Sequence, residues 1–133
     1  MAVVPTREQI TEFLGLDLEG EIVMLNLLKY RERADDGEGS GEEAYGKYAD
    51  AARRMVAERG GRLVWVGRAV HTLIGEPGED WDVIALVAYP NRDAFIEMTS
   101  NTEYKEAHKD REAGLERTVL VASKAAAVFG DEA

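Results

Sequence analysis

The feature that most constrains this chain is a run of seven apolar residues from Val83 to Tyr89, which follows Asp82 and ends at Pro90. The run is rich in valine and too short for a domain-length helix, so it predicts a β-strand. It shows no polar alternation, and both faces of the strand are therefore expected to be buried. We expect a chain of 133 residues to offer helices for one face only, and a second copy to cover the other.

Composition and charge exclude several classes of protein. The chain is 45% hydrophobic and long enough for one domain with a real core. Acidic residues outnumber basic ones by 26 to 16, which argues against nucleic acid and anionic membranes as partners. With no cysteine, disulfides, thiolate nucleophiles and zinc–thiolate sites are excluded. The N-terminus lacks a secretion signal and no stretch is long enough to cross a bilayer, so we expect a cytoplasmic protein.

Residue patterns predict strands alternating with helices along the chain. Thr6 with Gln9, and Ser40 with Glu43, have the spacing of capping boxes at helix starts. The predicted elements are a helix at 7–14, a strand at 21–30, a helix at 41–59, a strand at 62–73, a strand at 83–89, a short helix after Asn91, a helix at 103–113 and a strand at 117–123. A bend or bulge is expected at Gly67 in the second strand.

After the leading helix, this order is βαββαβ. It predicts an α+β, ferredoxin-like fold with a four-stranded antiparallel sheet and helices on one face. We assign residues 1–20 to an N-terminal helical extension, 21–123 to the ferredoxin-like domain and 124–133 to a C-terminal tail. Residues 31–41 are acidic and glycine-rich, so we expect a solvated loop there rather than a calcium site.

Several short motifs follow one another in an order typical of one family. They are Met24 to Tyr30, Tyr48 ahead of Gly60-Gly61-Arg62, Trp81-Asp82, Tyr89 to Phe95, and Glu103-Tyr104 followed by His108 and Arg111. Over about Glu21 to Ser123, the chain resembles the domain-of-unknown-function family numbered 1330, in the dimeric α/β-barrel superfamily. The resemblance implies a homodimer whose two sheets pack into one barrel, with ligands between sheet and helices, but it supplies no reaction.

The helix at 103–113 carries the strongest candidates for a site. Tyr104, His108 and Arg111 are spaced i, i+4 and i+7, so they share one face. In a pocket, Arg111 would hold an anionic or enolate oxygen, His108 would move a proton and Tyr104 would donate a hydrogen bond. The alternative is that Arg111 extends over the rim or pairs with Glu112 or Asp82. In the family a histidine and an arginine are adjacent here, whereas two residues separate them in this chain.

Four other residues are candidates with a structural alternative each. Asn26 interrupts an apolar strand, so its amide must bond either a substrate carbonyl or bulged backbone. The Tyr48 hydroxyl would enter a pocket, or the ring would belong to the core. His71 would be a general base or a rim residue at a strand end. Asp82 would bind substrate or orient a histidine or arginine, or it would face water.

No motif points to a cofactor. A metal site would need His71, His108 and a carboxylate to converge, and neither HxH nor HExxH spacing occurs, so no metal is expected. Haem bound through His108 is disfavoured, and no glycine-rich nucleotide loop is present. The first hypothesis is therefore a cofactor-free enzyme, isomerase-like or monooxygenase-like, acting on a small anionic or keto/phenolic compound. The alternatives are a non-catalytic dimeric binding or sensor module, and a scaffold that fills its own cavity.

Overall fold

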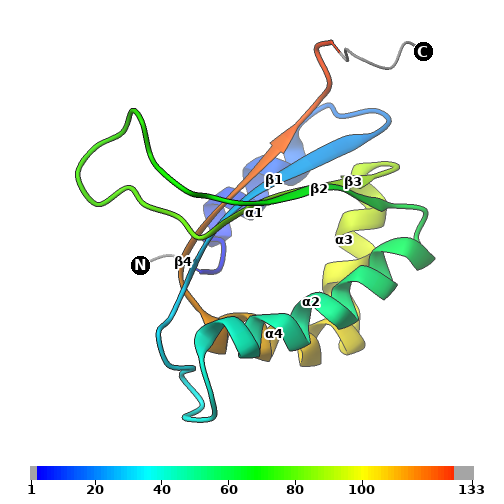
Figure 1. The fold of residues 1–133 in the computed structure, drawn as a ribbon. Coiled ribbons are helices and arrows are strands. Elements are labelled where there is room, and N and C mark those ends of the chain that lie inside the picture. The colour runs from blue at the N-terminus through cyan, green and yellow to red at the C-terminus, as the bar shows by residue number, and fades with distance from the viewer. Residues whose placement is uncertain (1–2, 128–133) are drawn as a thin grey trace.

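The computed structural model describes residues 3–127, which form one ferredoxin-like domain with a leading helix (Figure 1). Most of the tail expected at 124–133 lies outside the described residues. The elements are α1 (Arg7–Gly15), β1 (Ile22–Tyr30), α2 (Gly41–Glu58), β2 (Arg62–Arg68), β3 (Val83–Tyr89), α3 (Arg92–Ser100), α4 (Thr102–Gly114) and β4 (Leu115–Ser123). Both expected capping boxes are present, at Thr6 and Ser40.

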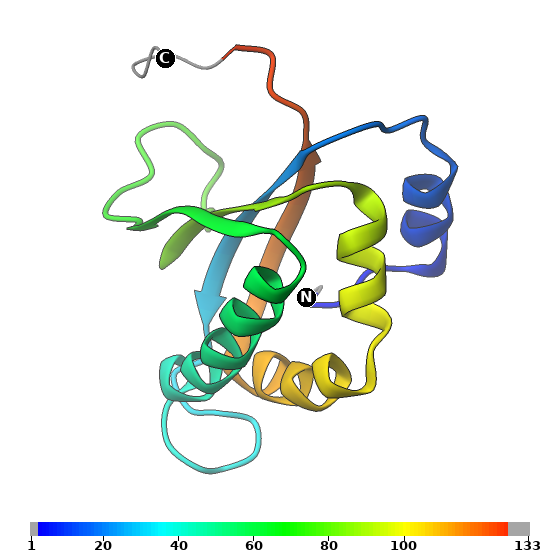
Figure 2. The same cartoon turned by 90° about the vertical axis from the view of Figure 1, so that its right-hand side faces the viewer.

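The strands form an open, antiparallel, four-stranded sheet in the order β2-β3-β1-β4. Helices α2, α3 and α4 lie on one side of this sheet, as the two views at right angles show (Figures 1 and 2). The predicted α+β class, strand count and one-sided helix layer are therefore confirmed. The apolar strand Val83–Tyr89 lies inside the sheet, between β2 and β1.

The core lies between the sheet and the helices. Alternate residues of β1 point toward the helices, and Ile22, Met24 and Leu28 are at most 4% exposed. Ile22 and Met24 pack with Met55 of α2 and Met98 of α3, which are equally buried. The helical layer thus covers this inner face through side chains spaced three and four residues apart.

Backbone contact at two glycines fixes α2 against the end of α4. The Arg31 amide donates to the Gly114 carbonyl at 2.8 Å, and the Gly41 amide donates to the Arg31 carbonyl at 3.1 Å. A Cβ at Gly114 would lie 2.5 Å from the Gly41 carbonyl oxygen and 2.8 Å from the Tyr45 amide. Only glycine fits this contact, which brings the face of α2 that carries Tyr48 close to α4.

Several predicted boundaries were wrong. The second strand ends at Arg68 instead of residue 73, because its last ladder bond is from the Ala69 amide to the Asp82 carbonyl. Residues 69–81 then leave the sheet as a long loop, where the Thr72 hydroxyl bonds the Glu79 carbonyl at 2.7 Å. The last strand begins at Leu115, two residues earlier than expected.

The expected irregularity in β2 lies at a different residue. The register shifts between Leu63 and Trp65, so the extra residue is Val64 and not Gly67. Gly67 has another role, since a Cβ there would come within 2.0 Å of the Trp65 ring. The missing side chain lets the indole lie flat along its own strand.

The other face of the sheet, which we call the outer face, is apolar and has no helix of the described residues over it (Figures 1 and 2). The pairing register assigns eight large apolar side chains to it: Val23, Leu25, Leu27, Trp65, Ile84, Leu86, Val119 and Val121. Trp65 and Val121 are 53% and 48% exposed. An apolar face of this extent is typical of an interaction surface.

We expect Gly114→Ala to lower the free energy of unfolding by about 3 kcal/mol, since an added Cβ would collide with backbone that has no room to move. Thermal unfolding followed by circular dichroism measures the change. Gly46→Ala is the matched control, because a Cβ at that position of α2 meets nothing within 4 Å. The control should gain up to about 1 kcal/mol from helix propensity. An unchanged melting temperature for Gly114→Ala would contradict the proposed contact.

Candidate functional site

A cavity of about 1440 Å³ lies between the inner face of the sheet and the helices. It exceeds the roughly 300–1,000 Å³ of most small-molecule sites, and apolar and aromatic side chains form most of its wall. The N-terminal segment closes one side with Val3, Pro5 and Ile10. Arg92 of α3 holds this segment, because its guanidinium donates to the Phe13 carbonyl at 2.8 Å.

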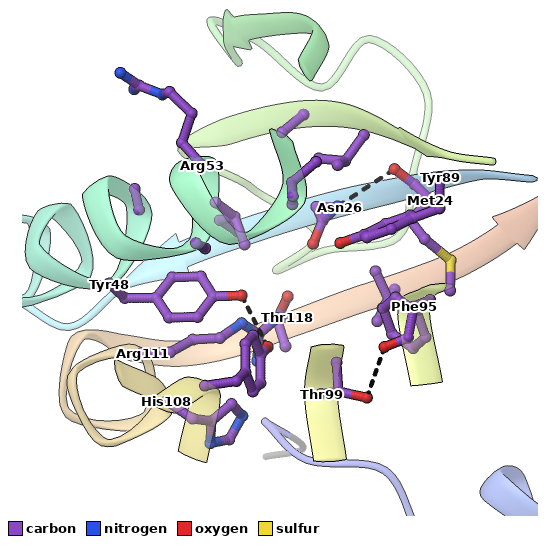
Figure 3. A pocket seen from close by; sticks show the side chains of 18 of the residues that line it. Met24, Asn26, Tyr48, Arg53, Tyr89, Phe95, Thr99, His108, Arg111 and Thr118 are labelled. Atoms are coloured by element: carbon purple, nitrogen blue, oxygen red, sulfur yellow. Dashed lines mark hydrogen bonds between the residues drawn. The ribbon is translucent and has the colours of Figure 1, made fainter. Parts of the chain in front are cut away.

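The sheet contributes a mostly apolar floor with a single amide in it. Asn26 lies on β1, paired with Ala85 of β3 and Leu120 of β4, and it lines the cavity with both neighbours. Its Nδ2 donates to the Met24 carbonyl at 3.3 Å (Figure 3). That bond uses one of four hydrogen-bonding positions of the amide, so Asn26 can present the others to a ligand.

Two phenols from different helices meet at the α2/α4 side of the cavity. The hydroxyls of Tyr48 and Tyr104 lie 2.8 Å apart, and their rings meet edge to face (Figure 3). Burial raises the pKa of Tyr48 well above its usual value and also raises the pKa of Tyr104. Both hydroxyls are therefore protonated at neutral pH and act as hydrogen-bond donors.

Arg111 of α4 is a buried cation beside the phenols. Its side chain extends under the Tyr48 ring, with the guanidinium carbon 5.8 Å from the ring centroid (Figure 3). It is 6% exposed and donates to the Val3 carbonyl at 3.0 Å. Among residues 3–127, no carboxylate lies within 4.0 Å of it. The alternatives in which Arg111 pairs with Glu112 or Asp82 are not what the structure shows.

His108 lies one turn before Arg111 on the same helix face and lines the cavity. Burial and the nearby Arg111 charge lower its pKa, and Glu112 opposes this from 3.5 Å. Its ring lies 5.7 Å from that of Tyr104, centroid to centroid. At neutral pH the imidazole is therefore uncharged and able to accept a proton.

The structure thus brings Asn26, Tyr48, Tyr104, His108 and Arg111 to one cavity. The two remaining candidates lie elsewhere. His71 is exposed on the loop between β2 and β3. Asp82 lies at the base of that loop, where its carboxylate accepts the Tyr30 amide at 2.8 Å and it does not line the cavity.

Sequence reasoning missed two parts of the wall. Thr118 lies on the inner side of β4, paired with Leu28, and its hydroxyl bonds the Leu27 carbonyl at 2.7 Å. The strand's alternation could have identified it. The segment around Val3 gave no local signal, because only the tertiary fold brings it to Arg111.

Between residues 3 and 127, no group of three or more histidine, aspartate and glutamate side chains could hold a metal ion. None of the helices in that range combines the length and apolar character needed to cross a bilayer.

Solved structures similar to this chain share its fold. A protein of unknown function from Rhodopseudomonas palustris is 36% identical, with a TM-score of 0.89 over 95% of this chain and 98% of that one. SnoaB, a cofactor-independent oxygenase from Streptomyces nogalater, is 16% identical, with a TM-score of 0.56 over 85% of this chain and 100% of that one. A dimeric ferredoxin-like protein of unknown function from Bacteroides fragilis is 18% identical, with a TM-score of 0.52 over 80% of this chain and 98% of that one.

Sequence comparison gives the family. None of the curated proteins matches the chain. The pattern that defines a domain of unknown function, DUF1330, matches residues 39–125 and so covers most of the domain. The 36% identity to the Rhodopseudomonas palustris protein extends over nearly the whole chain. The chain therefore belongs to the DUF1330 family, as the order of its motifs indicated.

Proposed function

We propose that the protein binds a small, largely apolar compound through one anionic or enolisable oxygen, and that it acts on this compound as a cofactor-free enzyme. The observation that carries the proposal is Arg111, a buried guanidinium at the edge of an apolar cavity with no carboxylate partner in residues 3–127. An uncompensated buried cation costs several kcal/mol, and an anionic ligand would offset that cost. Charge-assisted hydrogen bonds to such a ligand are each worth about 1.5–3 kcal/mol.

The hydrogen-bond inventory of the site supports a single ligand oxygen beside Arg111. A guanidinium has five N–H donors, and one of these is used by the Val3 carbonyl. The Tyr48–Tyr104 pair has two O–H groups and uses one between its members, so one remains for a ligand. A carboxylate, enolate or carbonyl oxygen would accept from both the guanidinium and the free phenol.

The neutral imidazole of His108 supplies the base for a reaction at that ligand. His108 would take a proton from the carbon next to the carbonyl, and the electron pair would move to the oxygen, where Arg111 stabilises the enolate. Return of the proton to a different carbon gives an isomerisation. The same carbanion would be the species that reacts with O₂ in a monooxygenase-like step. His71 and Asp82 have no role in this proposal, since neither lines the cavity.

Two comparisons support parts of this proposal. SnoaB is a cofactor-independent oxygenase, so a similar fold carries a reaction without a cofactor in that protein. The Bacteroides fragilis protein is dimeric, and the apolar outer face described above supports a homodimer here as well. If the ligand leaves unchanged, the same cavity would serve a non-catalytic binding or sensor module.

The first test uses an apolar anion and its neutral analogue as probes. We expect the wild-type protein to bind 1-anilinonaphthalene-8-sulfonate about tenfold more tightly than uncharged N-phenyl-1-naphthylamine, because only the sulfonate pairs with Arg111. Arg111→Met should abolish the preference while both probes still bind. Fluorescence titration measures the two dissociation constants.

Arg53→Met is the matched control, since Arg53 is exposed at the rim of the cavity and its side chain points outward (Figure 3). This variant should keep the preference for the sulfonate. Equal affinity of the wild type for the two probes would contradict the proposed anion site.

The second test concerns the protonation of His108. Its pKa in the folded protein is lowered, so the unfolded chain takes up the proton first as pH falls. The stability contributed by the neutral ring is complete above about pH 6.5 and is lost as the pH falls below that value. We expect His108→Asn to flatten the decline in free energy of unfolding between pH 7 and pH 5, as measured by urea denaturation. His71→Asn is the control on an exposed histidine, and an identical slope for all three proteins would refute a lowered pKa.

The third test separates catalysis from binding. A panel of keto acids and cyclic ketones is incubated with the protein in D₂O, and mass spectrometry detects deuterium at the carbon next to the carbonyl. We expect label with the wild type and at least a hundredfold slower labelling with His108→Ala, since general-base catalysis contributes about 10²–10⁴-fold. Compounds that bind through Arg111 but acquire no label would favour the binding module.

A further inference from the structure

The loop of residues 69–81, which we call the arm, carries the most exposed apolar side chains of the described chain. It connects β2 to β3 and extends away from α2 and α4, on the side of the outer face (Figures 1 and 2). Val70, Leu73 and Ile74 are 87%, 84% and 91% exposed. The next large apolar side chain among the described residues, Trp65, is only 53% exposed. Monomeric proteins rarely leave such a cluster in water.

Polar contacts hold the base of the arm in place. The Arg117 guanidinium donates to the Gly78 carbonyl at 3.0 Å and to the Asp80 carboxylate at 2.8 Å, and it lies 4.3 Å from the Trp81 ring centroid. Lys29 adds an ion pair to Asp80 at 2.7 Å. These contacts fix both the direction and the root of the arm. The arm would therefore lose little additional conformational freedom when a partner binds its tip.

Hydrogen bonds within the arm also give it a defined shape. The Thr72 hydroxyl donates to the Glu79 carbonyl, and the Glu76 amide donates to the Glu79 carboxylate, each at 2.7 Å. The apolar tip is thus presented on a preformed loop rather than on a disordered segment. Burying one such aliphatic side chain strengthens association by about tenfold or more.

We propose that the arm is a dimerisation element, which packs its tip against a second copy of this chain. The inference rests on the homodimer of the proposed function and is independent of the cavity. The arm begins directly after β2, whose Trp65 belongs to the outer face. A copy that covers the outer face would therefore lie beside the arm. Each copy carries a net charge of −10, so apolar contact has to supply the attraction.

The areas involved support this occupant. The sheet has four strands of seven to nine residues, so its outer face covers about 450 Å² at the usual strand spacing and rise. A stable complex buries about 800 Å² on each partner. The sheet alone falls short of that value. An aliphatic side chain of this size carries roughly 100 Å² of apolar surface. The three that are almost fully exposed on the arm therefore add roughly 300 Å². The outer face and the arm together approach the area that each partner buries in a stable dimer.

The test measures the dimer dissociation constant by sedimentation equilibrium. We expect the wild type to be a dimer at micromolar concentration and the double variant Leu73→Ser/Ile74→Ser to dimerise at least about 10⁴-fold more weakly, since each dimer loses four aliphatic side chains and each is worth about tenfold or more. Val70→Ser, a single substitution in the same cluster, should weaken it by about a hundredfold, because each dimer loses two side chains. Leu63→Ser is the matched control, because Leu63 is 45% exposed but faces the cavity side of the sheet. It should leave the dimer unchanged.

Three results would overturn the inference: a monomeric wild type at 100 µM or so, an unchanged dissociation constant for the double variant, or an equal loss in the control. Val121→Glu, on the outer face, separates the arm from the dimer itself. If this variant dissociates and the arm variants do not, the homodimer stands and the arm has no part in it. The preference for the sulfonate probe tests the cavity alone, so its failure would be distinguishable from failure of the arm.

Discussion

A single layer of helices covers a sheet that is apolar on both faces, and this imbalance governs the rest of the structure. The inner face is closed by α2, α3 and α4, with Met55 and Met98 fully buried against β1. The outer face keeps Trp65 and Val121 about half exposed. Apolar surface of that kind has a free-energy cost of about 25 cal/mol per Å² in water. The need to cover it connects the fold to the proposed homodimer and to the arm.

The helical layer covers the inner face of the sheet without filling the space between the helices and the sheet. Two glycines, Gly41 and Gly114, hold α2 against the end of α4, so the helices are close to each other at one end. Away from that contact, a cavity of about 1440 Å³ separates the helices from the sheet. A scaffold that fills its own cavity would not have this space. The five candidate polar side chains in it come from three elements distant in sequence, namely β1, α2 and α4.

Electrostatics distinguishes the two faces of the sheet. Arg117 lies on the arm side with Asp80 as its partner, which is an ordinary structural ion pair. Arg111 lies on the cavity side, buried with a backbone carbonyl and a phenol ring as its neighbours. Removing a guanidinium from water without a carboxylate is costly, and such an arrangement is more typical of binding sites than of structural networks. The neutral state of His108 follows in part from the same charge.

The sequence by itself determined the fold and much of the site. Helical spacing on α4 grouped Tyr104, His108 and Arg111, and an amide inside an apolar strand marked Asn26, because side-chain direction follows from local periodicity. Tertiary structure alone decided the rest. Contacts between residues far apart in sequence decide three features. Arg111 donates to the Val3 carbonyl, His71 lies on an exposed arm, and Asp82 accepts from the Tyr30 amide. Local patterns carry no information about such contacts, because they are fixed by how whole elements pack and not by the residues next to them.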